Sequence, residues 1–161
     1  MRKIAIILLF LLAVSRVASA REIDMETDAI LNSAEGLFKA MKSGDYAGVW
    51  TRLTQESKDT IVKDVLKELV KSDNAPPIGQ LHRDFELGSS IIVRSYWDAY
   101  VDNFNPSTVL DNSKWEMGEV KGNKAEIILK YKKSENPAHL RMFKEAGLWK
   151  VGLVETFWNR K

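Results

Sequence analysis

The chain has 161 residues, no cysteine, and 24 basic against 22 acidic side chains. The lack of cysteine excludes disulfide bonds and thiol chemistry, so the stability of the fold must come from packing, which a domain of this size can supply. The net charge of +2 indicates no basic surface of the kind that binds nucleic acid.

The first twenty residues have the pattern of a secretory signal peptide. Two basic residues precede an apolar run over 4–14, and Ala18–Ser19–Ala20 forms an Ala-x-Ala cleavage site. The run of 11 residues is short for a membrane-spanning helix, which needs about 20 residues. We therefore expect cleavage at Ala20–Arg21 and a protein in the periplasm or secreted, without a membrane partner after cleavage.

Cleavage would change the composition as well as the length. It removes three basic residues and no acid, so the mature chain of 141 residues would have a net charge of −1. The basicity of the full chain therefore comes from the predicted leader, and no nucleic-acid partner is expected. Residues 21–161 show no repeat or linker and should form a single domain.

The next segment predicts two helices separated by a tight turn. A first helix should start near Thr27 or Asp28 and end at Gly44, because glycine takes the left-handed conformation that ends helices. Asp45 is a good cap for a short second helix over 46–53.

Three further elements are expected before residue 106. Thr54 should cap a third helix, which the segment 72–77 with its two prolines ends. Residues 81–87 alternate between apolar and polar, which predicts a short, half-exposed strand. A strongly amphipathic, aromatic helix follows after Gly88–Ser89–Ser90 and ends at Asn105–Pro106.

The last third of the chain is typical of an antiparallel β-meander. Predicted strands cover 114–120, 124–132, 139–144 and 148–158, with short turns between them. Helices followed by an antiparallel sheet indicate an α+β fold in which the sheet packs on the N-terminal helices.

Two stretches resemble a known superfamily. Phe38–Lys39–Ala40–Met41–Lys42–Ser43–Gly44–Asp45–Tyr46, with Trp50, Leu53 and Thr54 beyond it, resembles the amino-terminal signature of the nuclear transport factor 2-like (SnoaL-like) superfamily, especially exported bacterial members of unassigned function. Gly147–Leu148–Trp149–Lys150–Val151 is similar to the strand that ends many such domains. The resemblance spans most of residues 27–158. It implies a cystatin-like, cone-shaped fold with a curved antiparallel sheet wrapped on helices around an open cavity.

The resemblance implies a fold and leaves the reaction open. The superfamily includes isomerases, dehydratases, immunity proteins and plain binding modules. No cofactor is expected, because Gly-rich phosphate loops, nucleophile elbows and His-Glu-x-x-His patterns are absent from the sequence. His82, Asp84 and Glu86 alternate on one face of the predicted strand, but the simplest interpretation is a solvated face, so no metal site is predicted.

Glu155 is the acid best placed for chemistry. In the predicted strand 148–158 it shares a face with Trp149, Val151 and Leu153, which should point inward. A desolvated carboxylate suits a general base or a ligand anchor. The alternative is that the strand has left the core by then or that a bulge turns Glu155 outward, because charged residues are rarely buried.

The predicted cavity combines side chains from the aromatic helix and the last strand. Trp97 and Tyr100 should border it, opposed by Trp149 and Val151, with Glu155 toward one end. A cavity of this kind suits an apolar or planar ligand.

The sequence supports hypotheses from more than one class. The first is an exported, non-catalytic module that binds a small apolar ligand, a peptide or a partner protein in or beside the cone. The second is a cofactor-independent isomerase or dehydratase with Glu155 as base and a Tyr or Trp donor near the developing oxyanion. A structural role, as a homodimer through an exposed sheet face, is the third.

Overall fold

The computed structural model describes the backbone of residues 2–71 and 75–158, and the side chains of these residues from Ile23 onward. In this part of the chain, helices come first and a four-stranded sheet follows. The elements are α1 (Arg2–Ser43), α2 (Tyr46–Arg52), α3 (Gln55–Val70), α4 (Ile78–Leu87), α5 (Ile91–Asn103), α6 (Pro106–Asn112), β1 (Ser113–Lys121), β2 (Lys124–Tyr131), β3 (Ala138–Glu145), β4 (Leu148–Gly152) and α7 (Leu153–Phe157).

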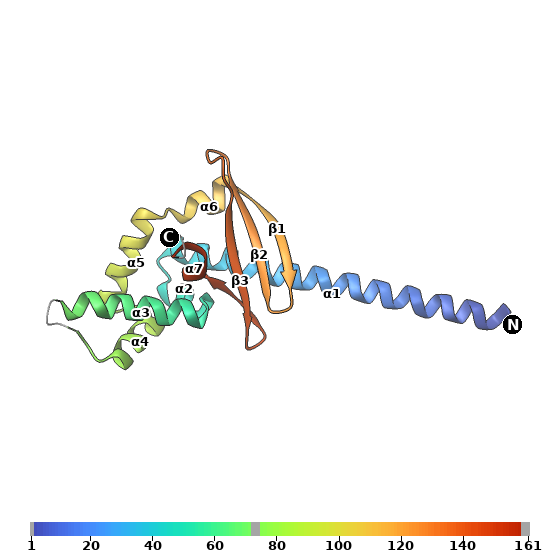
Figure 1. Cartoon of the computed structure of the whole chain (residues 1–161), viewed down its shortest axis with the longest axis horizontal. Coiled ribbons are helices and arrows are strands. Elements are labelled where there is room, and N and C mark those ends of the chain that lie inside the picture. Colours follow the sequence, from blue (N-terminus) through green and yellow to red (C-terminus); the bar gives the residue numbers. More distant parts are fainter. Residues whose placement is uncertain (1, 72–74, 159–161) are drawn as a thin grey trace.

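The four strands form one antiparallel meander in the order β1-β2-β3-β4. Ala125 and Ile127 of β2 pair with Met142 and Leu140 of β3, and all four side chains are buried. Figure 1 shows the shorter helices on one side of a curved, unclosed sheet, with α1 running past it. The predicted fold class, an α+β fold with a curved antiparallel sheet packed on N-terminal helices, is confirmed.

The edge of the sheet at β4 is covered by the helical part of the protein. Ser33 Oγ of α1 donates a hydrogen bond of 2.6 Å to the backbone oxygen of Trp149. Thr54 N donates to Val151 O at 3.1 Å, and Leu53 forms a parallel bridge with Val151. These contacts fix the start of α3 against the end of the sheet, where an open edge would otherwise expose unpaired backbone groups.

The predicted helix caps around residue 45 and residue 54 are confirmed. Gly44 has a φ of 71°, the left-handed conformation that lets the chain leave α1. The Asp45 side chain accepts a hydrogen bond from Gly48 N, and the Thr54 side chain accepts one from Ser57 N. The local sequence therefore determines where α2 and α3 begin.

The predicted start of the first helix is wrong. Residues 23–26 already belong to α1, so this helix does not begin at Thr27 or Asp28. Both residues are good caps, but no glycine or proline precedes Gly36 in the sequence to interrupt the helix. The predicted cleavage at Ala20–Arg21 lies outside the residues whose side chains are described, and export stays a prediction. Among the described residues, no helix combines the length and the apolar character needed to cross a membrane.

The predicted strand over 81–87 is also wrong, because this segment forms α4. Leu81 and Phe85 are its fully buried residues, and their i, i+4 spacing fits a helix as well as the alternation fits a strand. Gly88 ends α4 with a φ of 67°, and a Cβ at this position would lie 2.4 Å from Ala47 N. Glycine is therefore required both by the backbone conformation and by the close approach of α2.

Proline opens a short helix after α5. Asn105 accepts a hydrogen bond from Ser107 N, and Pro106 occupies the first turn of α6. The predicted end of the aromatic helix near Asn105 agrees with the end of α5 at Asn103. Helix α6 was not predicted from the sequence, although a proline at a first helical position is a known start signal.

The last predicted strand is too long. β4 ends at Gly152, and residues 153–157 turn into α7. A Cβ at Gly152 would lie 2.6 Å from Phe143 Cε2, so the chain turns here with its backbone close to a ring of β3. Thr156 Oγ1 accepts a hydrogen bond of 3.0 Å from Arg141 N, which holds α7 against β3.

Aromatic rings form a continuous row along α5. Phe85, Tyr96, Trp97, Tyr100 and Phe104 contact one another in sequence, with ring-centroid distances of 5.6, 5.1, 5.7 and 5.6 Å. α5 packs against α1 and α2. The rings therefore fill space between helices, and much of the apolar face of α5 is used in contacts with other rings.

The tyrosines of this region predict a loss of stability at alkaline pH. Burial, followed by a hydrogen bond to Asp98, raises the pKa of Tyr46 to about 12, and burial also raises the pKa of Tyr96 and Tyr100. The folded state thus holds these protons more tightly than the unfolded chain, whose tyrosines titrate near pH ~10. The contribution of these tyrosines to the free energy of unfolding should be constant below that pH and fall as the pH rises through the folded pKa values. Urea denaturation measured across this range of pH tests the predicted loss of stability. Tyr46→Phe should reduce the dependence on pH, and an equal dependence in this variant would contradict the assignment to Tyr46.

Candidate functional site

The residues predicted to line a cavity lie in the packed interior. Trp97 and Val151 are fully buried, Trp149 and Glu155 are each 6% exposed, and Tyr100 is half-buried. Trp97 and Tyr100 touch edge to face, as expected for neighbours on one side of α5. Trp149 has the Lys144 ammonium over its ring at 5.5 Å. None of the five lines the apolar groove between α3 and α5 or the charged groove on the sheet.

Two buried indole groups carry a polar atom without a partner. The Nε1 atoms of Trp97 and Trp149 make no hydrogen bond among the described residues. Such a buried donor costs about 1–3 kcal/mol. Ring packing, and not hydrogen bonding, therefore holds these two side chains in place.

Glu155 is the centre of a buried hydrogen-bond cluster. Thr54 Oγ1 donates to Glu155 Oε1 at 2.6 Å, and Ser57 Oγ donates to Glu155 Oε2 at 2.5 Å. Ser57 Oγ in turn accepts from Val154 N at 3.1 Å. Thr54, Ser57 and Glu155 are 1%, 0% and 6% exposed. Of the two positions that the sequence left open for Glu155, the structure has the inward one, and a helix and not a strand produces it.

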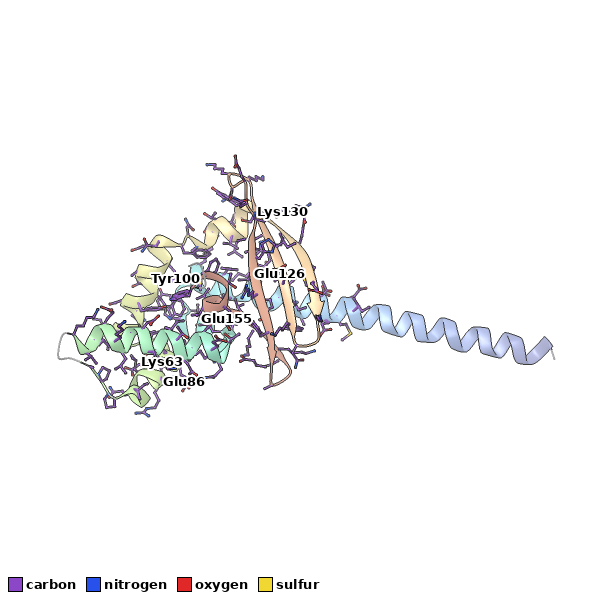
Figure 2. All side chains as sticks on the ribbon, viewed as in Figure 1. Lys63, Glu86, Tyr100, Glu126, Lys130 and Glu155 are labelled. Atoms are coloured by element: carbon purple, nitrogen blue, oxygen red, sulfur yellow. The ribbon has the colours of Figure 1, made fainter. Side chains whose placement is uncertain are left out.

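The position of the carboxylate explains why burial is tolerated. Thr54 caps α3 and Ser57 lies in its first turn, where the backbone N–H groups give the helix end a partial positive charge. Figure 2 shows Glu155 where α7 lies beside α3. Each carboxylate oxygen accepts a hydroxyl proton, as a buried charge requires. Glu155 thus connects the end of the chain to the start of α3.

The same geometry bears on catalysis. A general base must hold an oxygen within hydrogen-bond reach of a substrate proton. Both oxygens of Glu155 already accept hydroxyl protons, and the side chain is 6% exposed. This arrangement favours a structural role for Glu155.

An apolar groove lies between α3 and α5 on the surface. Its volume is about 480 Å³, within the usual size range of sites for small ligands. Most of its lining is apolar, and Ile91 at its border is 81% exposed. The lining residues are Asp64, Val65, Glu68 and Leu69 of α3 and Ile91, Ile92, Ser95 and Tyr96 of α5.

The charged residues of this groove are both acidic. Glu68 is exposed and forms an ion pair of 2.7 Å with Lys71, and this hydrogen bond lowers the pKa of Glu68. Burial is the main cause of the raised pKa of Tyr96, and the Asp64 carboxylate adds to it. Asp64 therefore adds negative potential at the phenol of Tyr96, a residue that also lines the groove.

A second groove, of about 350 Å³, lies on the sheet and differs in character. Its lining mixes both signs of charge, with Glu119 and Glu126 beside Lys121, Lys124 and Arg141. Glu126 also lies 3.0 Å from His139 Nδ1. Mixed charges of this kind are typical of a solvated surface.

The described residues contain no group of three or more His, Asp or Glu side chains that could hold a metal ion. His82, Asp84 and Glu86 lie on helix α4, where His82 and Glu86 are one turn apart on one face and Asp84 lies on another, so the three do not share a face.

The groove was not predicted from the sequence. Val65 and Leu69 recur at helical spacing on α3, a pattern that fits core packing, and they are half-buried. Ile91 and Ile92 are adjacent apolar residues in the first turn of α5, so one of them must face away from the core. That adjacency was the available signal.

Comparisons with known proteins identify no relative. No family model, no curated protein and no solved structure matches this chain. The resemblance to the nuclear transport factor 2-like superfamily therefore stays a prediction.

Proposed function

We propose that the protein is a non-catalytic binding module that acts outside the cytoplasm and holds a small, largely apolar ligand in the groove between α3 and α5. The observation that carries this proposal is the groove itself, about 480 Å³ in volume and lined mainly by Val65, Leu69, Ile92 and Tyr96. Apolar sites of this size with a few polar groups are the usual form of small-molecule sites.

The groove replaces the interior cavity as the proposed ligand site. The residues expected to border that cavity are occupied by packing or by hydrogen bonds, whereas the groove residues are open to solvent on one side. Ile91, which lines the groove, is 81% exposed. Burying this apolar surface under a ligand would remove it from water, which favours binding by about 25 cal/mol per Å².

The isomerase or dehydratase alternative loses support because its proposed base is engaged. Glu155 accepts hydroxyl protons at distances of 2.6 and 2.5 Å. Binding without catalysis requires no acid–base pair, so the groove alone is sufficient for the proposed function.

Filling the groove should abolish the binding of a neutral apolar probe. Ser95 lines the groove and is exposed, so Ser95→Phe places a ring in the groove without disturbing the core. We expect N-phenyl-1-naphthylamine to increase in fluorescence with the wild-type protein and to lose at least about tenfold in affinity with Ser95→Phe, because the ring occupies the volume that the probe needs.

The matched control is Lys63→Phe on the same helix as Asp64. Lys63, labelled in Figure 2, is exposed and does not line the groove, so the probe should bind this variant like wild type. Equal binding to wild type and Ser95→Phe would contradict the proposed site.

A further inference from the structure

We infer that the ligand of the α3–α5 groove is a small amphiphilic cation, with an apolar body against the two helices and a protonated amine held by Asp64. This inference rests on the proposed function and adds the charge of the ligand and the residue that selects it.

The charge distribution of the groove carries the inference. Among its lining residues, Asp64 and Glu68 are the charged ones, and both lie on α3 while the α5 side supplies Ile91, Ile92 and Tyr96. A ligand in the groove would therefore meet apolar side chains from both helices, with the two carboxylates on the α3 side. An anionic ligand would be repelled by the Asp64 carboxylate, whereas a cation gains from it.

Asp64 is the better counter-ion of the two acids. Lys71 Nζ lies 2.7 Å from Glu68 Oε1 and already neutralises much of that charge. Asp64 lies one turn earlier on the same face of α3, and its field reaches the Tyr96 phenol. A ligand amine near Asp64 would thus lie close to the Tyr96 side chain.

The size of the groove selects a small molecule. Its lining residues span only 64–69 on α3 and 91–96 on α5. At 1.5 Å of rise per residue, this is roughly 8 Å along each helix, which accommodates one compact apolar body.

Three compounds with the same alkyl chain and different charges show how much of the affinity comes from charge and how much from apolar contact. At neutral pH decylamine is positively charged, decanol is neutral and decanoate is negatively charged. Each compound can be tested for displacement of N-phenyl-1-naphthylamine from the full protein. We expect the affinity order decylamine, decanol, decanoate. Asp64→Asn should weaken decylamine about fivefold, as expected for one ion pair at a partly exposed site, and leave decanol unchanged.

The control removes an acid elsewhere on the surface. Glu86 is exposed on α4, is labelled in Figure 2 and does not line the groove. Glu86→Gln therefore removes one negative charge, as Asp64→Asn does, without changing the groove. Decylamine should bind this variant like wild type. Raising the salt concentration should weaken decylamine and not decanol.

Two results would overturn the inference. If the three compounds bind with equal affinity, or if Glu86→Gln weakens decylamine as much as Asp64→Asn does, the groove does not select a cation; decanol displacement would then still support the apolar site. If neither decanol nor the probe binds to the wild-type protein, both the inference and the proposed function fail.

Discussion

Replacing Trp97 with alanine should lower the free energy of unfolding by about 3–5 kcal/mol, the range found for large aromatic side chains removed from a core. Trp97 is fully buried and touches the rings of Tyr46, Tyr96 and Tyr100. Its removal leaves a cavity that three surrounding rings cannot fill without moving. Urea denaturation followed by circular dichroism measures the change.

Two other variants test whether the loss of stability in Trp97→Ala comes from lost ring packing. Trp97→Phe should recover much of the loss, because the Trp97 Nε1 atom has no hydrogen-bond partner to lose among the described residues. Trp158→Ala removes a ring that is 39% exposed and stacked on Tyr100, and it should cost clearly less. A Trp97→Ala protein as stable as wild type would contradict the assignment of Trp97 to the core.

Ser57→Ala should lower the free energy of unfolding by about 2–5 kcal/mol, because it affects two buried groups at once. The Ser57 hydroxyl donates to Glu155 Oε2 and accepts from Val154 N. Its loss leaves a buried carboxylate short of a donor and a backbone N–H short of an acceptor. Thermal and urea denaturation measure the effect. Ser134→Ala, at an exposed turn, is the matched control and should change stability by less than about 0.5 kcal/mol.

A double-mutant cycle tests whether Ser57 and Glu155 act together. Glu155→Leu removes the charge that Ser57 serves, so Ser57→Ala should cost less in that background than in wild type. The two hydroxyls of Thr54 and Ser57 lie 2.9 Å apart and can bond to each other once the carboxylate is gone. Strictly additive losses would contradict a structural link through Glu155.

Local sequence signals predicted the elements whose ends depend on nearby residues. Asp45, Thr54 and Ser90 act as caps because each side chain accepts a hydrogen bond from the backbone N–H three residues onward. The sheet was predictable for a similar reason, since short turns connect strands that are neighbours in sequence. The α+β class followed from these two patterns.

The wrong secondary-structure predictions fall where two sequence patterns fit the same residues, or where a contact with a distant residue determines the local structure. Leu81 and Phe85 satisfy both a period of two and a spacing of i, i+4, and packing against α2 selects the helix. The turn at Gly152 depends on Phe143, a residue of the preceding strand that local sequence does not place. A pattern of alternating residues alone therefore extended β4 too far.

The candidate site was the least predictable part. The sequence left the inward position of Glu155 open, because its partners Thr54 and Ser57 lie about one hundred positions earlier and no motif joins them. The groove likewise requires α3 and α5 to lie at a particular separation, which depends on packing of the whole domain.

The most direct test of the ligand site is a map of the residues that respond to ligand. Amide chemical shifts of the ¹⁵N-labelled protein can be followed by NMR while N-phenyl-1-naphthylamine is added. The groove predicts that the largest changes fall on 64–69 and 91–96, and that Trp149, Val151 and Glu155 change little. Changes concentrated on Trp149, Val151 and Glu155, with 64–69 and 91–96 unaffected, would place the ligand in the interior and contradict binding in the groove.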